Sequence, residues 1–289
     1  METSTSLRIG IQKKGRLTDE TVTLLKNIGL EFDGYKNRLM VRSRNFDVEI
    51  LLIRDDDIPE YVQDGVCDIG FVGANVTAER DADVQVLLDL NFGHCHLSLA
   101  APKSSDIRKV EDFQGKRVAT SYPRLTRRFF ESQGLDVEII TISGAVEITP
   151  ALDVADAICD LVSTGSTLKA NGLIELDTIL ESQTQLIQTS KSISQGKQDL
   201  IDKFLVRIQG QQAADESRYI MMNAPRASLE KISHIIPSLN SPTVLPLANP
   251  DMIAIHSVIS IREFWVVMEK LKEAGATGIV MLPIQNMIL

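Results

Sequence analysis

Cysteine and positive charge are both scarce in this sequence. Its three cysteines (Cys67, Cys95 and Cys159) are widely spaced and form no Cys-x-x-Cys pair. This pattern argues against a disulfide framework and favours a reducing compartment. Lysine and arginine together number 30 against 39 aspartates and glutamates, which gives a formal net charge of -9. A general nucleic-acid binder needs a basic surface and is therefore not expected.

Long apolar runs are also missing. No stretch approaches the roughly 20 apolar residues of a membrane-spanning helix. The first six residues, METSTS, have neither the basic start nor the apolar run of a secretory signal. There is no low-complexity tract and no short-period repeat. We therefore expect a cytoplasmic protein that does not engage a membrane.

What the sequence does contain is an ordinary globular composition, with 289 residues of which 44% are hydrophobic. At about 150 residues per domain, this length predicts roughly two domains. In the first part of the chain, apolar strands are expected at residues 7–12, 46–54 and 67–72. Helices are expected at residues 18–26, with Thr18 as N-cap, and directly after Asp57, a second N-cap. This alternation predicts a parallel sheet with helices on its faces.

A second α/β pattern follows a strand at residues 94–101. Its expected strands are residues 116–120, 137–142 and 157–162, and its expected helices are residues 123–133, 146–154 and 166–171. A strand then returns near Leu186, and residues 197–211 form a long amphipathic helix. A chain that leaves one lobe, builds another and returns predicts a cleft between two lobes. Ligands in such folds bind at the carboxyl ends of the strands.

The tail of the chain has a different order of elements. Strands are expected at residues 218–223, 243–247, 252–259 and 278–282, and helices at residues 228–236 and 261–274. The order β-α-β-β-α-β is ferredoxin-like. The polar segment 210–216 is the expected linker to this domain.

The segment with the clearest chemistry is the loop at residues 163–167, which follows the apolar strand 157–162 and opens a helix. Backbone N–H groups at a helix start are free to bind an anion, Gly165 lets the backbone approach a ligand, and the neighbouring hydroxyls add donors. Asp156 and Asp160, just upstream, could bind ribose hydroxyls or hold Mg²⁺. A simple capped helix with solvated acids is the alternative. The loop lacks the Gly-Lys-Ser/Thr of a Walker A motif.

These segments closely resemble the ATP phosphoribosyltransferase family. The matching segments are residues 12–17, 53–59, 68–73, 117–123, 143–147 and 155–172. With a looser match in the tail, the resemblance runs in order from about Leu7 to Pro283. Each motif alone is weak, but together they are specific.

The resemblance implies an α/β fold with two periplasmic-binding-protein-like lobes that form a cleft, plus a C-terminal ferredoxin-like (ACT-like) α+β domain. The corresponding ranges are 1–101 with 184–213 for lobe I, 102–183 for lobe II, and 214–289 for the regulatory domain. It also implies the family's reaction with Mg²⁺ as cofactor: N1 of ATP attacks the anomeric carbon of phosphoribosyl pyrophosphate, and pyrophosphate leaves. This is the first step of histidine biosynthesis.

The resemblance further implies which residues form the site. The implied catalytic residues are Arg16, Asp156 and Asp160, and the implied metal ligand is Asp156. The implied substrate contacts are Lys14, Gly15, Asp68, Gly73, Glu147, Ser163, Thr164, Gly165, Ser166 and Thr167. Because the nucleophile is a ring nitrogen of the substrate, no Ser–His or Cys–His relay is needed. Positioning and charge stabilisation are the chemistry that remains.

The tail resembles the regulatory domain of the long form of this family, which binds histidine as a feedback inhibitor. The candidate histidine contacts are Asn223, Leu239, Thr243, Val258 and Gly278. The long form forms dimers that assemble into hexamers and needs no separate regulatory subunit. A tail used only for oligomer contacts is the alternative.

Two other functions fit the fold pattern. A two-lobed solute-binding or sensor protein would bind a ligand without turnover, and a catalytically silent paralogue would act as a regulatory subunit. The intact Arg16, Asp156 and loop argue against the second. We expect Thr167→Ala or Asp156→Ala to cause a large loss of activity while the fold is kept.

Overall fold

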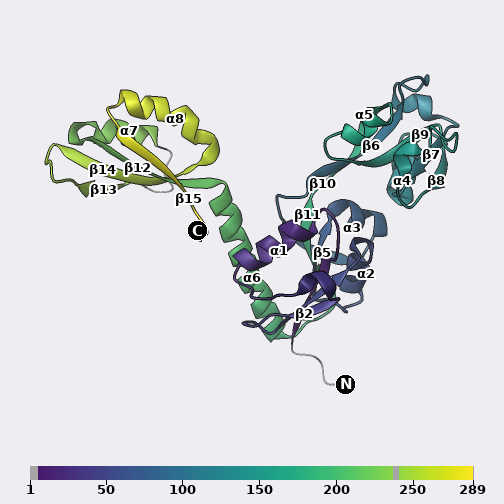
Figure 1. Cartoon of the computed structure of the whole chain (residues 1–289), viewed down its shortest axis with the longest axis horizontal. Helices are drawn as coiled ribbons and strands as arrows, with labels where there is room; N and C mark the ends of the chain where they lie inside the picture. Colours follow the sequence, from purple (N-terminus) through teal and green to yellow (C-terminus); the bar gives the residue numbers. More distant parts are fainter. Residues whose placement is uncertain (1–5, 237–240, 289) are drawn as a thin grey trace. The chain divides into compact units, whose positions relative to one another are not determined.

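The computed structural model describes residues 6–236 and 241–288, which form three β-sheets (Figure 1). The chain divides into two compact units between Gln198 and Asp199. The first unit holds two of the sheets, and the second holds the third. No helix of the described residues is both long and apolar enough to cross a bilayer.

Lobe I is built on a six-stranded sheet with the order β2-β3-β1-β4-β11-β5. The strands are β1 (Leu7–Gln12), β2 (Met40–Arg42), β3 (Val48–Ile53), β4 (Ile69–Gly73), β5 (Val84–Asp89) and β11 (Thr184–Thr189). The helices are α1 (Thr18–Asn27), α2 (Ile58–Gln63) and α3 (Ala74–Arg80). The three central strands β3, β1 and β4 are parallel, and β4 is buried along its whole length. The prediction of a parallel sheet in this part of the chain is therefore confirmed.

The two predicted N-caps of this lobe behave differently from expectation. Leu17, not Thr18, holds the N-cap position of α1, because the Thr18 hydroxyl instead donates to the backbone carbonyl of Gln12 at 3.2 Å. Asp57 does precede α2, which opens with Ile58 and Pro59, but its side chain makes no capping hydrogen bond. The Thr18 prediction was wrong, and the Asp57 prediction was right in position only.

Lobe II is built on a five-stranded sheet with the order β10-β6-β9-β7-β8. The strands are β6 (Cys95–Pro102), β7 (Arg117–Thr120), β8 (Glu138–Thr141), β9 (Ala157–Val162) and β10 (Leu173–Ser182), and the helices are α4 (Pro123–Ser132) and α5 (Ser166–Ala170). Strands β8, β7 and β9 are parallel, whereas β6 and β10 are antiparallel to their neighbours. Phe113 and Phe130 are fully buried in the core on one face of this sheet.

One predicted helix of lobe II was wrong. Residues 146–154 form only a short 3-10 helix, η4 (Val146–Ile148), followed by turns. Ala145 and Asp153 at its two sides both have positive φ angles, 51° and 54°. A left-handed residue cannot continue a right-handed helix, so no helix can extend before residue 146 or past residue 152.

The two lobes are joined by the strands β6 and β10, and Figure 1 shows β10 running along this connection. Cys95 and Ser182 are partners in the antiparallel ladder at the point where the chain enters and leaves lobe II. Strand β6 belongs to the second sheet, so the second lobe begins near Cys95 rather than after residue 101.

The second unit starts within α6 (Gln195–Asp215), which is longer than the predicted helix. Most of the segment predicted as a linker, residues 210–216, is helical and continues this helix. The remaining elements are β12 (Ser217–Pro225), α7 (Leu229–Ile235), β13 (Thr243–Pro246), β14 (Met252–Ser260), α8 (Ile261–Glu273) and β15 (Thr277–Pro283). The predicted order β-α-β-β-α-β is confirmed. The sheet order β13-β14-β12-β15 is the antiparallel order of a ferredoxin-like fold.

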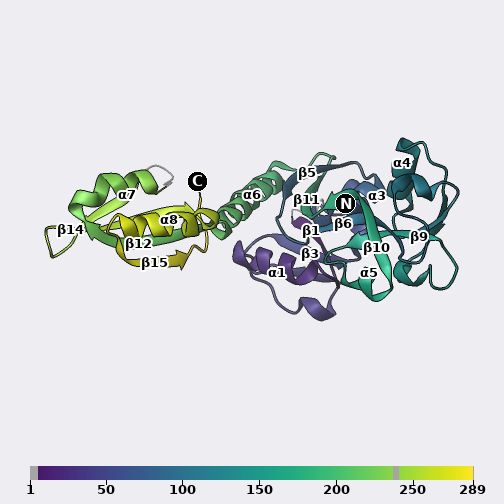
Figure 2. The ribbon, with the colours of Figure 1, turned by 90° about the horizontal axis from the view of Figure 1, so that it is seen from above.

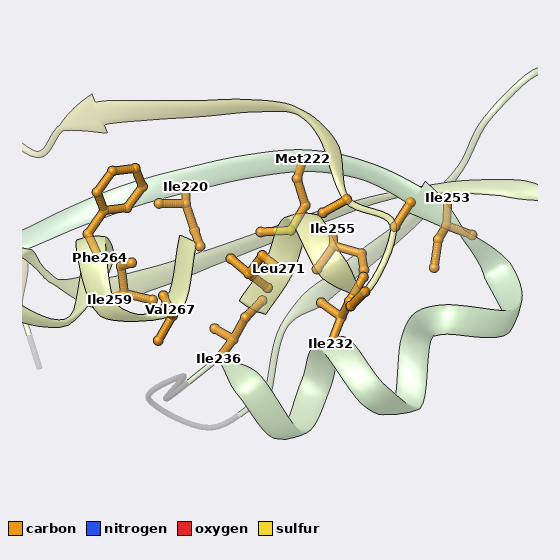
Figure 3. Packing of buried hydrophobic residues seen from close by; sticks show 13 residues of the cluster. Ile220, Met222, Ile232, Ile236, Ile253, Ile255, Ile259, Phe264, Val267 and Leu271 are labelled. Carbon is orange, nitrogen blue, oxygen red and sulfur yellow. The ribbon is translucent and has the colours of Figure 1, made fainter. Parts of the chain in front are cut away.

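The core of this unit lies between the sheet and its two helices. Figure 3 shows Ile220 and Met222 from β12 and Ile255 from β14 pointing toward Leu271 of α8 and Ile232 of α7. The alternate residues of β12 and β14, among them Asn223 and Val258, therefore lie on the opposite face of the sheet.

Candidate active site

The carboxyl ends of the parallel strands of both lobes border one cleft. Its cavity has a volume of about 500 Å³. Lobe I contributes residues that follow β3 and β4, and lobe II contributes residues that follow β7 and β8. Figure 2 shows α3 of lobe I beside α4 of lobe II at this boundary. The cleft predicted from the alternation of strands and helices is thus present, at the expected ends of the strands.

Arg16 bridges the two lobes from the loop after β1. Its Nη1 donates to the Ser163 hydroxyl at 2.6 Å, and its Nη2 lies 3.0 Å from the buried Cys95 thiol. Arg16 therefore joins lobe I both to the predicted phosphate loop and to the strand that crosses between the lobes. This contact brings together residues that are 147 positions apart in the sequence.

The turn that carries Arg16 depends on Gly15. The φ angle of Gly15 is +147°, and a Cβ at this position would lie 2.4 Å from the Gln12 side chain. That Gln12 side chain accepts a hydrogen bond from the Leu17 backbone at 3.1 Å and so holds the start of α1. Lys14 is exposed beside Gly15. The sequence-predicted residues 14–16 thus form one tight loop at the cleft end of β1.

The predicted phosphate loop lies at the carboxyl end of β9. Ser163, Thr164, Ser166 and Thr167 are all exposed, and the Thr164 and Ser166 hydroxyls are 3.0 Å apart. Gly165 has a φ angle of +69° and is the N-cap of α5, where its own lack of a side chain leaves the backbone open. The five residues therefore present several hydroxyl donors on one short turn.

Asp160 lies inside the cleft end of lobe II, on β9. Burial raises the pKa of its carboxyl to about 6, opposed by a hydrogen bond from the Leu161 backbone, and the negative charge of Glu147 raises it further. Glu147 comes from η4 and is half-buried. These two carboxylates therefore act on each other electrostatically. A desolvated carboxylate near a cleft is a typical feature of functional sites.

Asp156 lies before β9, away from the loop at residues 163–167. It precedes β9, whereas the phosphate loop follows this strand, so about 20 Å of extended chain separates them. Its carboxylate accepts hydrogen bonds from the Arg117 backbone N–H at 2.8 Å and from the Arg117 guanidinium at 2.9 and 3.3 Å. The Arg117 hydrogen bonds hold the pKa of Asp156 below its usual value. In this structure Asp156 thus anchors the start of β9 through Arg117.

Asp68 is the counterpart of Asp156 in lobe I. It precedes β4, at the end opposite to the cleft, and accepts the Arg8 backbone N–H at 2.8 Å, as Asp156 accepts that of Arg117. Lys197 neutralises it at 2.9 and 3.0 Å. In this structure Asp68 is therefore buried against Arg8 and Lys197, at the end of β4 that is farther from the cleft. The two lobes use the same device, a buried or half-buried aspartate that fixes the start of a central strand.

Gly73, at the cleft end of β4, makes room for a residue that the sequence did not single out. A Cβ on Gly73 would lie 2.4 Å from the Asn75 amide oxygen. Asn75 is buried and donates to the Tyr122 hydroxyl of lobe II at 3.0 Å, while Ser182 donates to its amide oxygen at 2.8 Å. Nothing in the local pattern around Asn75 or Tyr122 indicates this contact, because it is formed only when the lobes meet.

The described residues contain no group of three or more His, Cys, Asp or Glu side chains placed to hold a metal ion. Asp156, the predicted metal ligand, is occupied by Arg117. The pair Asp160 and Glu147 does fit Mg²⁺ that arrives bound to a polyphosphate, because Mg²⁺ usually takes one or two protein carboxylates and keeps its other ligands from phosphate and water.

The predicted regulatory residues lie in the second unit. Asn223 and Gly278 are neighbours, because a Cβ on Gly278 would lie 3.8 Å from the Asn223 amide nitrogen. Thr243 pairs with His256, and Val258 pairs with Tyr219, four residues from Asn223 along β12 and so about 13 Å away. The structure therefore brings together only the first two. Leu239 lies outside the described residues.

Comparisons with known proteins agree along nearly the whole chain. A family model described as ATP phosphoribosyltransferase matches residues 54–210, and one described as HisG, C-terminal domain, matches residues 214–286. Curated proteins named ATP phosphoribosyltransferase from Parabacteroides distasonis and Phocaeicola vulgatus are each 43% identical over 283 residues, which is 98% of this chain and 100% of each relative.

Solved structures give the same picture of the fold. The ATP phosphoribosyl transferase (HisG:HisZ) complex from Thermotoga maritima matches with a TM-score of 0.61 and 31% identity, over 69% of this chain and 96% of that chain. Tv2483 bound to L-arginine matches with a TM-score of 0.50 and 15% identity, over 74% of this chain and 87% of that one, and is similar in fold alone. The expected fold, two periplasmic-binding-protein-like lobes followed by a C-terminal α+β domain, is confirmed.

Proposed function

The chain belongs to the ATP phosphoribosyltransferase family, and from this premise we propose how its residues carry out the reaction. It is a pentosyltransferase that condenses ATP with phosphoribosyl pyrophosphate in the first step of histidine biosynthesis, releasing pyrophosphate. The observation that carries the assignment of residues is the contact of Arg16 with Ser163 across the cleft. It places a cation of lobe I on the phosphate loop of lobe II.

We assign the loop at residues 163–167 to the 5-phosphate of phosphoribosyl pyrophosphate. Support comes from its exposed hydroxyls and from the left-handed Gly165, which frees the backbone to face an anion. Asp160, three residues before the loop, accepts hydrogen bonds from the ribose hydroxyls. Its negative charge also favours the positive character that the ribose gains as the bond to pyrophosphate breaks.

The departing pyrophosphate is assigned to Arg16 and Lys14. Arg16 can bind two phosphate oxygens with its planar guanidinium, and Lys14 adds a point charge beside it. When bound, Mg²⁺ neutralises part of the leaving group's charge, with Asp160 and Glu147 as its protein carboxylates. These residues hold charges in fixed positions, which is what a reaction with a substrate nucleophile requires.

ATP is assigned to the cavity between the lobes. Arg54 and Arg80 line this cavity and can pair with the triphosphate, while Tyr122, Val76 and Ile142 offer apolar surface for the purine. Gly73 contributes indirectly, through the Asn75 that its missing side chain accommodates.

The tail is proposed to bind histidine and inhibit the enzyme, with Asn223 and Gly278 at the contact and Thr243 and Val258 farther along the same sheet.

We propose three functional parts: lobe I, lobe II from near Cys95 to Ser182, and a regulatory domain from about residue 214. The Thermotoga maritima structure is a HisG:HisZ complex, and the match to it covers only 69% of this chain. The additional tail supports a chain that needs no separate regulatory subunit. Homo-oligomers and a reducing, cytoplasmic location, consistent with three free cysteines, complete the proposal.

The test is a direct assay of the purified protein. ATP, phosphoribosyl pyrophosphate and Mg²⁺ are mixed, and the ultraviolet absorbance change on alkylation of adenine N1 is followed with and without histidine. Turnover that histidine suppresses would support both the cleft and the tail assignments. Turnover that ignores histidine would leave the cleft in place and remove the regulatory proposal. Ligand binding without turnover would favour the solute-binding or silent-paralogue hypothesis.

A further inference from the structure

The helix α4 of lobe II begins without a cap of its own. Its N-cap residue is Tyr122, whose side chain makes no capping hydrogen bond, and its first residue is Pro123. The backbone N–H groups of Arg124 and Leu125 in the first turn have no carbonyl one turn earlier to bind. Most helices satisfy such groups with a Ser, Thr, Asp or Asn at the N-cap. The sequence of α4 therefore leaves two donors that need a partner from elsewhere.

The partner comes from the other lobe. Glu79, in α3 of lobe I, accepts the Arg124 N–H at 2.8 Å with one carboxylate oxygen and the Leu125 N–H at 2.9 Å with the other. A carboxylate is also the favoured charge at the positive end of a helix. Glu79 is half-buried and lines the cleft cavity together with Tyr122 and Pro123. The cap of α4 is thus part of the wall of the site.

Two further contacts lie on either side of this cap. Asp81 pairs with the Arg124 guanidinium, and Asn75 binds the Tyr122 hydroxyl at 3.0 Å. The Asp81–Arg124 pair is exposed on both sides, so water and salt weaken it. The Glu79 contact is bidentate, and separation of the lobes would leave α4 uncapped. Among the contacts at this boundary, Glu79 is the one that ties the stability of a helix to closure of the cleft.

We infer that Glu79 is a positioning residue for the phosphoribosyl transfer: by capping α4 from lobe I, it holds the two lobes in the closed arrangement that binds substrate. This inference rests on the proposed use of the cleft. The contribution of an N-cap corresponds to about a tenfold bias toward the closed arrangement. Apparent affinity is reduced by the fraction of the protein that is not in the binding-competent state. At saturation, however, substrate binding itself closes the lobes. The effect therefore falls on KM and leaves kcat nearly unchanged.

The experiment uses full-length protein carrying Glu79→Ala, Glu79→Gln or no change. We expect Glu79→Ala to raise the KM for ATP about tenfold and to change kcat by less than about twofold. Glu79→Gln keeps one carbonyl oxygen and should raise KM less. Glu131→Ala is the matched control, because it removes the same charge from an exposed position at the other end of α4. Asp81→Asn tests the exposed pair and should change KM by less than about twofold.

Backbone hydrogen exchange gives a second readout that does not depend on turnover. In Glu79→Ala, the amides of Arg124 and Leu125 should exchange about tenfold faster, while the amide of Phe130 in the body of α4 keeps its wild-type rate. Wild-type KM together with wild-type exchange at these two amides would overturn the inference. So would a lowered kcat and melting temperature with KM unchanged, since that result describes a merely structural residue. If the wild-type protein shows no turnover, the proposed function fails. The exchange rates then test by themselves whether Glu79 caps α4.

Discussion

Asp156 directly precedes β9 and Asp160 is the fourth residue of this strand, and replacing them should give opposite results. Asp156→Ala should lower the stability of the fold and keep the catalytic rate. Asp160→Asn should abolish most of the activity and keep or raise the stability. The sequence motifs assign a catalytic role to both aspartates, so they predict a loss of activity in both variants. Measuring the two variants therefore tests whether the motifs or the structure assign the roles correctly.

The size of the Asp156 effect follows from its partners. Alanine leaves the Arg117 backbone N–H without its acceptor and removes the charged partner of the guanidinium. Loss of an acceptor at a half-buried donor costs about 1–2 kcal/mol, because part of the ion pair is exposed and screened by water. For a unit of this size, that corresponds to a fall in Tm of about 2–6 °C. Since the pKa of Asp156 is lowered in the fold, this stabilisation is present at neutral pH and disappears as pH falls through the folded-state value.

The Asp160 effect has the opposite sign. Its pKa is raised from 3.8 to about 6, so the folded chain binds the proton of this carboxyl more tightly than the unfolded chain does. Ionisation therefore weakens the fold as pH rises from about 4 to 6, and the cost is fully present at pH 7. Asparagine carries no charge and removes this cost, which is at most about 3 kcal/mol and about 1–2 kcal/mol after allowance for solvent. The gain in stability should vanish below pH 4.

The assay measures Tm from pH 3.5 to 8 and steady-state turnover at pH 7.5 for the wild type and both variants. Asp156→Ala should keep kcat within about threefold, and its Tm should approach that of the wild type at the acid end. Asp160→Asn should lower kcat about a hundredfold, as the loss of a charge placed at the reacting centre does. If Asp156→Ala loses activity with an unchanged Tm, or if Asp160→Asn keeps full activity, the assignment of the two aspartates is refuted.

Three further substitutions test other parts of the molecule. Arg16→Lys cannot keep both of its contacts across the cleft, so kcat/KM should fall about a hundredfold with little change in Tm; equal loss in Tm and activity would contradict this role. Gly15→Ala forces a Cβ to within 2.4 Å of Gln12 at a φ of +147°, so it should cost about 1–3 kcal/mol in thermal unfolding, and an unchanged Tm would show that the turn can relax. Asn223→Ala should raise the histidine concentration needed for half inhibition at least about fivefold and leave uninhibited turnover unchanged; unchanged inhibition would place the histidine contact elsewhere.

The sequence predicted secondary structure best where a strand is determined by its own local sequence. The central strands β1, β4 and β9 are predicted to within two residues because most of their residues are apolar and buried. Strand β10 was missed for the opposite reason. Two register shifts, between Glu175 and Asp177 and between Thr178 and Leu180, interrupt its alternation of apolar and polar residues.

The candidate site was predictable only in part. The loop at residues 163–167 and the turn that carries Arg16 are continuous segments, and the structure places them on either side of one cleft. The roles of Asp68 and Asp156 were not predictable, because the residue that neutralises each one is 129 or 39 positions away. Sequence motifs give the order of residues along the chain. They do not record whether a residue stands at the beginning or the end of its strand.

The meeting of Cys95 and Ser182 in one ladder has a consequence for how this enzyme can change. The segment that forms lobe II leaves and re-enters the rest of the chain at adjacent points. It is therefore an inserted segment, or cassette, whose two ends already lie together. Such a cassette can be exchanged between related chains without lengthening a connection. Transplanting it would move Asp160 and the loop at residues 163–167, the proposed phosphate site, as a single unit. The residues of lobe II and those of lobe I could then be recombined independently between related chains.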